Sequence, residues 1–345
     1  DKIAQVQKAD TVAWGMDDSV VQARVMYGDG SRRVFVANSL GFIAEDSRDS
    51  LVFMVQGIVT RDSLMETGYE PVGGSRGYEL FTEIPPEEVA RKAISRALTT
   101  LRARRAPAGP MPVVLSSEAG GTMIHEAIGH GLEADLAGEG LSVYSGKLGQ
   151  QVASHAITVI DDGSIRGLRG SMGCDDEGSP TQRSVLVDKG VLTGFMTDLL
   201  SARKYGLPLT GNARRESYRH RPVPRMTNTM IQPGSLDPGE VVKKAARGIF
   251  VKKMGGGQVN TVTGDFVFNI SEGYLIENGS VGEPVRGATL IGNGPKVLSS
   301  IELVGNDLGF GIGTCGKDGQ GVPVADAQPT LLIPEITVGG EIRND

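Results

Sequence analysis

The feature that most constrains the fold is a motif with two histidines five positions apart, His125-Glu126-Ala127-Ile128-Gly129-His130. Two imidazoles close together beside a carboxylate are typical of a divalent metal with a general base next to it. The familiar zinc-protease pattern, H-E-x-x-H, puts both histidines on one helix face. On a regular α-helix, five steps of about 100° would separate the two rings by roughly 140°. The rings can share one ion only if the helix is distorted.

Two glycines make that distortion accessible, because Gly129 and Gly131 flank His130. Glycine relaxes the backbone where a helix must widen or break. A π-bulge or local unwinding, both frequent at functional sites, would bring the imidazoles together. We therefore predict that the metal motif lies on a distorted helix, capped by Thr122. His125 and His130 are the predicted metal ligands, and Glu126 is the predicted base.

Composition favours strands over helices, with 49 glycines and only 5% aromatic residues. We expect an α+β fold that is β-rich, with mostly antiparallel sheets and a few helices. Residues 1–84 read as β-rich: Val20–Tyr27 and Arg33–Asn38 flank a Gly-Asp-Gly turn, and Leu51–Thr60 is a third strand. Gly68–Gly77 reads as a loop.

A helix is predicted from Pro85-Pro86, where proline and two acids open it, to the arginines after Leu101. Ala106–Pro112, with three prolines, is the best domain boundary. Beyond the metal motif, glycine and aspartate turns separate antiparallel strands, for example Ser184–Val187 and Val191–Met196. One further helix is predicted at about Pro238–Ala246.

Global properties exclude several classes of protein. The formal net charge of −6 argues against nucleic acid as the main partner. No signal peptide is recognisable, and no apolar run approaches the roughly 18 residues that span a membrane. Two cysteines give no disulfide framework, so a reducing cytoplasm is the expected location. The chain starts at Asp1 within what reads as a folded unit, and we expect preceding residues.

A catalytic zinc generally takes three protein ligands and leaves a fourth position for water. The candidates for the third ligand are Cys315, Cys174, His155, His220, Glu133 and Asp135. Cys315 lies in a glycine-rich segment that can approach another element closely, and Lys317 could help to hold its thiolate. Cys174 sits among acids that would raise its pKa. Cys315 is therefore the better ligand. Glu133 or Asp135 could orient a ligating imidazole instead.

The residues His125–Asp135 and Cys315–Val324 closely resemble the signatures of the TldD/PmbA family of metallopeptidases, as do Asn212–His220 and Pro224–Thr229. The resemblance covers essentially the whole chain and is to the TldD subunit, since the PmbA (TldE) partner lacks the His-Glu-His set. It implies His125, His130 and Cys315 as metal ligands and Glu126 as base. It also implies that residues 1–105 are the remainder of an N-terminal α/β domain, and residues 106–345 a C-terminal β-rich catalytic domain.

The function expected from this resemblance is zinc-dependent hydrolysis of unfolded or extended peptides in an enclosed cavity, in a complex with a PmbA/TldE-type subunit. Arg214, Arg215 and Tyr218 are predicted to bind the peptide backbone or a C-terminal carboxylate. Neither nucleic acid nor a membrane is an expected partner. Two alternatives remain open. One is a non-catalytic peptide-binding subunit with a structural metal; the other is a cysteine hydrolase with Cys315 as nucleophile.

Overall fold

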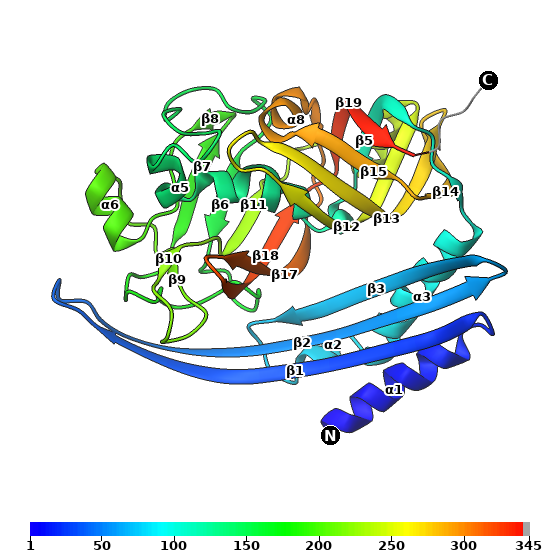
Figure 1. Ribbon diagram of the computed structural model, residues 1–345, viewed down its shortest axis with the longest axis horizontal. Coiled ribbons are helices and arrows are strands. Elements are labelled where there is room, and N and C mark those ends of the chain that lie inside the picture. Colours follow the sequence, from blue (N-terminus) through cyan, green and yellow to red (C-terminus); the bar gives the residue numbers. More distant parts are fainter. Residues whose placement is uncertain (341–345) are drawn as a thin grey trace.

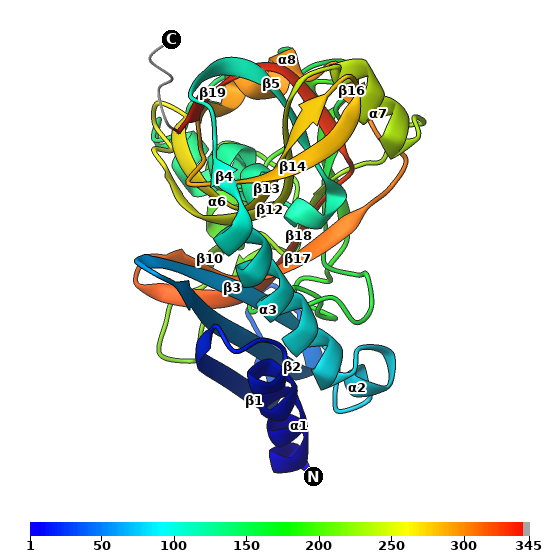
Figure 2. The ribbon, with the colours of Figure 1, turned by 90° about the vertical axis from the view of Figure 1, so that its right-hand side faces the viewer.

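The structure is a computed structural model that describes residues 1–340, and it has an N-terminal layer beside a larger C-terminal body (Figure 1). The N-terminal layer is a three-stranded antiparallel sheet with strand order β1-β2-β3. Burial alternates along β2 from Leu51 to Val59, and this buried face packs with helices α1 and α3 (Figure 2). The elements are α1 (Lys2–Gly15), β1 (Val20–Ala37), β2 (Ile43–Arg61), β3 (Leu64–Gly74), α2 (Leu80–Glu83) and α3 (Pro86–Arg102).

The predicted turn at Gly28-Asp29-Gly30 is wrong, because β1 runs straight through it, with Gly28 opposite Val52 and Gly30 opposite Ser50. Neither glycine has a positive φ. The chain instead reverses after Asn38, whose side chain accepts hydrogen bonds from the backbone of Leu40 and Phe42. The turn signal failed because glycine in an exposed, extended strand looks the same in sequence as glycine in a turn.

The predicted loop over Gly68–Gly77 is also wrong for most of its length, because β3 continues to Gly74. The glycine at position 68 is needed for packing: a Cβ there would lie 1.8 Å from the carbonyl oxygen of Ala93 in α3. Helix α1 was not predicted at all. By contrast, the predicted helix after Pro85 is confirmed as α3, and the helix at Pro238 is confirmed as α7.

The C-terminal body contains a six-stranded sheet with the order β17-β18-β11-β6-β7-β8 and a larger sheet with the order β12-β5-β19-β15-β13-β14-β4. Strand β12 pairs with both β5 and β13, so part of the larger sheet closes into a ring. Among the named strands of residues 1–340, the only parallel pairs are β11–β18, β12–β5 and β14–β4. The prediction of a β-rich α+β fold with mostly antiparallel sheets is therefore confirmed.

The strands of this body are β4 (Arg104–Arg105), β5 (Gly109–Leu115), β6 (Val159–Asp162), β7 (Arg183–Asp188), β8 (Val191–Leu192), β9 (Ala213–Arg214), β10 (Val223–Pro224), β11 (Asn228–Ile231), β12 (Gly248–Val259), β13 (Asp265–Glu277), β14 (Ser280–Arg286), β15 (Thr289–Asn293), β16 (Leu303–Val304), β17 (Gly309–Lys317), β18 (Gln320–Gln328) and β19 (Leu331–Gly339). Its helices are α4 (Thr122–Ile124), α5 (Ala134–Gly138), α6 (Leu199–Tyr205), α7 (Pro238–Ala245) and α8 (Gly294–Ser300).

The motif segment packs into the main core of this body, with Met123, Ile124 and Ile128 fully buried. Helix α4 begins at Thr122, and the residue in the N-cap position is Gly121, which has a φ of +72° and no side chain to cap with, so the prediction that Thr122 caps the helix is wrong. Within residues 1–340, no helix combines the length and apolar character needed to cross a membrane.

Candidate metal centre

The two motif histidines lie at the ends of a π-helical turn, His125–Gly129, which follows α4 and leads into a 3₁₀ turn, His130–Leu132. The amide of His130 donates to the carbonyl of His125, a bond that spans five residues. This wide turn places side chains five positions apart on one face, which a regular α-helix does not do. The ring centroids are 4.9 Å apart and the planes are nearly perpendicular, at 87°. The predicted helix distortion is confirmed.

Neighbouring side chains lie close to both glycines that flank His130. A Cβ at Gly129 would lie 2.1 Å from the sulfur of Met226, and one at Gly131 would lie 2.6 Å from the ring of Tyr144. The buried Tyr144 hydroxyl also donates to the carbonyl of Ala127, inside the wide turn. The π-helical turn is therefore stabilised by side chains that pack against it as well as by its own backbone hydrogen bonds.

Strand β17 brings Cys315 to the histidines. Its Sγ lies 3.5 Å from Nε2 of His130, and one ligand atom from each of His125, His130 and Cys315 lies within 4.8 Å of the other two. No other group of three or more potential metal ligands occurs in the described part of the chain. The structure thus brings together the three residues that the sequence singled out, across 185 positions of chain between His130 and Cys315.

A carboxylate holds each imidazole from behind. Nδ1 of His125 donates to Asp326 at 2.9 Å, and Nδ1 of His130 donates to Glu133 at 3.2 Å. Because a carboxylate only accepts, the proton sits on Nδ1 and the opposite nitrogen, Nε2, is left for a metal. Glu133 was a predicted orienting residue, whereas Asp326 was missed. The only sequence signal for Asp326 is a charged residue between two alanines in a buried strand.

Lys317 belongs to this outer layer of contacts. Its Nζ lies 3.0 Å from Glu133 and 2.7 Å from Asp135, and it also donates to the carbonyl of Pro224. Lys317 therefore contacts carboxylates, whereas the expectation from the sequence is that it holds the Cys315 thiolate. Its ammonium neutralises Glu133, the acid that accepts from His130.

The electrostatics of the cluster favour bound positive charge. Burial would raise the pKa of the Cys315 thiol, but hydrogen bonds from the two histidines outweigh it and lower that pKa to about 6. Burial would lower the pKa of His130, but Glu133 and Cys315 raise it to about 10. The pKa of His125 is also raised, through Asp326 and Cys315, against its burial. A thiolate and two carboxylates therefore surround the rings.

These donors fit a zinc ion. Bonds of about 2.0–2.1 Å to nitrogen and about 2.3 Å to sulfur place neighbouring ligands about 3.5 Å apart in a tetrahedron, which agrees with the Cys315–His130 distance of 3.5 Å. Two nitrogens and one thiolate leave a fourth position open, as catalytic zinc sites do.

Glu126 is half-buried and lines a cavity of about 820 Å³ together with His125. The cavity lies between the two parts of the molecule: Thr67–Gly73 of β3 and residues 83–92 contribute to one side, and β12, β17 and the motif contribute to the other. A candidate base and a candidate metal ligand thus face the same space, large enough for several residues of a peptide.

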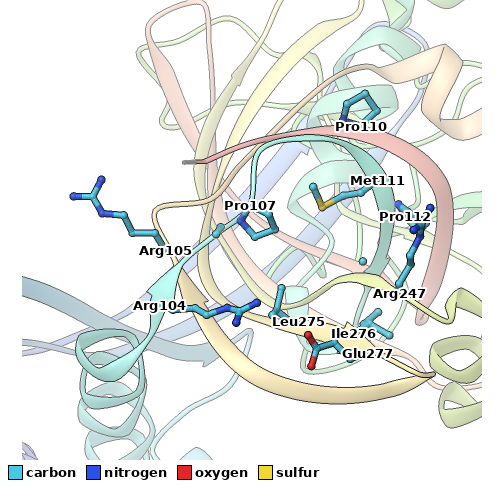
Figure 3. Close-up of a pocket in the computed structure, with 12 residues that line it drawn as sticks. Arg104, Arg105, Pro107, Pro110, Met111, Pro112, Arg247, Leu275, Ile276 and Glu277 are labelled. Carbon is cyan, nitrogen blue, oxygen red and sulfur yellow. The ribbon is translucent and has the colours of Figure 1, made fainter. Parts of the chain in front are cut away.

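Another cavity, of about 610 Å³, lies between β5 and the starts of β4 and β12 and includes none of these residues (Figure 3). Arg104, Arg105 and Arg247 are among the residues that line it, and the side chain of Arg105 extends away from the other two (Figure 3). Arg104 already pairs with Glu283 at 3.2 Å. This second space is separate from the metal motif.

The three predicted substrate-binding residues do not line the cavity beside Glu126. Arg214 is 5% exposed and donates to the carbonyls of Met226 and Pro323. Arg215 donates its backbone amide to Asp176, and Tyr218 is 77% exposed and accepts from Arg219. Burial lowers the pKa of Arg214 to about 10. Arg214 joins neighbouring backbones, and a role in substrate binding remains a prediction for all three.

The other ligand candidates lie elsewhere. His220 contacts Ser217 at 3.0 Å, and Cys174 is buried with its carbonyl bound by Arg48. Neither belongs to the His125–His130–Cys315 group.

Two family models account for almost all of the chain. Residues 1–101 match the PmbA/TldA metallopeptidase central domain, and residues 108–340 match the PmbA/TldA metallopeptidase C-terminal domain. The chain is 42% identical over 346 aligned residues to a Haemophilus influenzae protein called "Metalloprotease TldD homolog", covering 98% of this chain and 72% of that protein.

Solved structures share the fold. A crystal structure of a Thermotoga maritima protein matches with a TM-score of 0.83 and 27% identity, over 98% of this chain and 74% of that one. TldE from Thermococcus kodakarensis matches with a TM-score of 0.76 over 98% of this chain and 74% of that one; at 18% identity it shows the fold alone.

A wide helical turn that presents a histidine pair beside a glutamate, within this fold, defines a metallopeptidase-type protein. The chain belongs to the PmbA/TldD metallopeptidase family.

Proposed function

We propose that this protein is a zinc-dependent peptidase that hydrolyses unfolded or extended peptides, as the TldD-type subunit of a complex with a PmbA/TldE-type partner. The observation that carries the proposal is the convergence of His125, His130 and Cys315, with His125 and its neighbour Glu126 on the wall of the 820 Å³ cavity. The family name and the histidine–cysteine donor set support it.

His125, His130 and Cys315 would hold the metal. A zinc ion held there would supply a water of lowered pKa and a Lewis acid for the scissile carbonyl. Glu126 takes the proton of the attacking water and passes it to the leaving amine. Asp326 and Glu133 keep the two rings oriented through both events. Since Cys315 is only 3% exposed and lies among these groups, it acts as a ligand and not as a nucleophile.

The partner subunit, a cytoplasmic location and the division into domains are part of the same proposal. Residues 1–105 and 106–345 are proposed to be separate domains, because the buried cluster from Ala9 to Leu101 is distinct from the one that begins at Ala106. The fold shared with TldE supports a two-subunit assembly of related chains.

The test combines elemental analysis with cleavage of an unstructured peptide, with and without a PmbA-type subunit. We expect about one zinc per chain, hydrolysis by the wild type, and loss of hydrolysis by about 10²-fold or more in Glu126→Gln with zinc retained. The matched control is Glu139→Gln, an exposed change outside the cavity. Zinc at full occupancy without hydrolysis by the wild type would favour the non-catalytic alternative. Activity that survives chelation but is lost on thiol alkylation would favour the cysteine hydrolase.

A further inference from the structure

The cavity beside Glu126 has acids and cations on its walls, and almost all of its acids already have partners. Glu70 pairs with Arg96 at 2.9 Å, and Asp326 holds His125 at 2.9 Å. Glu83 and Glu88 also line the cavity, and each has an arginine within 4.0 Å, namely Arg76 and Arg91. Glu126 is the remaining acid, and it lines the cavity next to the proposed ligand His125.

The cations on the same walls, unlike these acids, have no ion-pair partners. Three lysines and arginines line the cavity without an ion pair within 4.0 Å among residues 1–340, namely Lys92, Arg169 and Lys253. Lys92 is exposed, which leaves Arg169 and Lys253. Both are partly buried, and burial lowers the pKa of each below its ordinary value. A partly buried cation without a counter-ion is energetically unfavourable until an anion arrives.

Arg169 is fixed in place. Its Nε donates to the carbonyl of Gly313 at 3.1 Å, and Nη2 lies 3.4 Å from the hydroxyl of Thr314. These residues immediately precede the ligand Cys315 on β17. The guanidinium is therefore anchored beside the strand that carries the metal ligand, with donors on Nη1 still available.

Lys253 comes from a different element, the irregular middle of β12, where the pairing with β13 shifts register on both sides of it. The charged groups around it are Glu70, Glu118 and Glu272, which attract it from beyond ion-pair distance, and Arg96, which repels it. Glu70 and Glu272 are bound by Arg96, at 2.9 and 2.8 Å. Glu118 has no ion pair among residues 1–340, but it too lies more than 4.0 Å from the Lys253 ammonium, so Lys253 has no direct counter-ion.

We infer that Arg169 and Lys253 bind a carboxylate of the peptide, from an acidic side chain or from its C-terminus, and so select acidic or C-terminal segments for the metal centre. The inference rests on the proposed peptidase function. It assigns the carboxylate recognition predicted for Arg214 and Arg215 to two other cations, which face the cavity.

The first test measures binding, in the Glu126→Gln background so that the peptides persist. Three labelled peptides share a neutral Gly-Ala-Ser core: one is amidated, one is amidated and contains a single glutamate, and one has a free C-terminal carboxylate. We expect at least one of the two carboxylate peptides to bind about 10-fold or more tightly than the neutral amide. Which of them does identifies the source of the carboxylate. The preference should weaken as salt is raised. Equal binding of all three peptides overturns the inference.

Variants then locate the effect. Arg169→Gln and Lys253→Gln should each remove most of the preference while leaving binding of the neutral amide within about 2-fold. Lys147→Gln changes a half-buried lysine in another part of the body and should leave the preference intact. Arg169→Lys keeps the charge but not the fork that holds Gly313, and it should retain a preference for carboxylate. If Arg169 served only to hold β17, then Arg169→Lys and Arg169→Gln would weaken binding of all three peptides equally.

The two proposals fail separately. A carboxylate preference without hydrolysis by the wild type would reject the peptidase function and keep the recognition site. Hydrolysis of all three peptides with equal kcat/KM would do the reverse.

Discussion

Asp326 accepts a hydrogen bond of 2.9 Å from His125 although the two residues are 201 positions apart in the chain. The contact ties the motif helix to β18, the neighbour of the strand that carries Cys315. It fixes the proton on Nδ1 and so the nitrogen that faces the proposed metal. The contact makes the metal site dependent on a strand that supplies no ligand.

Asp326→Asn should weaken metal binding by about 10- to 100-fold, because the amide is a poorer acceptor and no longer carries the charge that stabilises the ligand. Competition with a chromophoric chelator measures the affinity. Asp318→Asn, at the turn between β17 and β18, is the control, since its φ of +52° suits asparagine equally well. Equal affinities of the wild type and Asp326→Asn would contradict the role given to this carboxylate.

Gly121→Ala should destabilise the fold and also lower metal occupancy. Gly121 has a φ of +72°, and a Cβ there would lie 2.4 Å from the carbonyl carbon of Asp326. Gly140 has a φ of +76° with nothing within 4 Å of such a Cβ, so Gly140→Ala reports backbone strain alone. We expect a loss of about 1 kcal/mol in the free energy of unfolding for Gly140→Ala and about 3 kcal/mol or more for Gly121→Ala. Urea unfolding measures the loss for each variant. Equal losses would show that the close approach of the Gly121 backbone to that of Asp326 is unimportant.

Tyr144→Phe removes the hydroxyl that donates to Ala127 inside the π-helical turn. Since this group is fully buried, the free energy of unfolding should fall by about 1–2 kcal/mol. The matched change Tyr205→Phe removes an exposed bond to Glu139 and should cost less than about 0.5 kcal/mol. A smaller effect for Tyr144 than for Tyr205 would mean that the turn needs no support from this side chain.

Glu177→Gln should alter the pH dependence of stability. Burial, chiefly, raises the pKa of Glu177 from 4.5 to about 7. Between these pH values the native protein binds more protons than the unfolded chain, so stability falls as pH rises through this window. Glutamine removes that loss and can still accept from the amide of Leu199. We expect Glu177→Gln to be more stable than the wild type by about 1 kcal/mol at pH 8, a value reduced for partial exposure.

The comparison at pH 4 serves as the internal control for Glu177→Gln, because both side chains are then neutral and the difference should vanish. Denaturant unfolding at a series of pH values gives the curve. A difference of the same size at pH 4 and pH 8 would rule out titration of this carboxyl as the cause.

Much of the metal centre could be predicted from the sequence because its evidence is local. The five-position spacing of His125 and His130 required a distorted helix, and the glycines around His130 made a widened turn the natural solution. Cys315 stood out through its glycine-rich surroundings. Asp326 could not be found in this way. Its contact with His125 depends on the pairing of β17 with β18 and on the close approach of the Gly121 backbone to β18, and neither has a local signature in the sequence.

The errors in the N-terminal layer share one physical cause. Glycines at positions 28, 30 and 68 were interpreted as breaks, yet all three lie within strands. Gly68 is there because α3 lies directly on the strand backbone, a constraint that arises only in three dimensions. Arg169 and Lys253 escaped notice for a related reason: an unpaired charge is recognisable only when the partners of its neighbours are known.

The π-helical turn also limits which insertions and deletions the motif can tolerate. Removing one residue between His125 and His130 would recreate the common metalloprotease spacing, but it would rotate every later residue of the segment by about 100° around the helix axis. Leu132 and Glu133, now 0% exposed, would leave their sites, and Glu133 would lose Lys317. The longer spacing therefore depends on the contacts that follow it, and a single deletion that gives the shorter motif would disrupt those contacts.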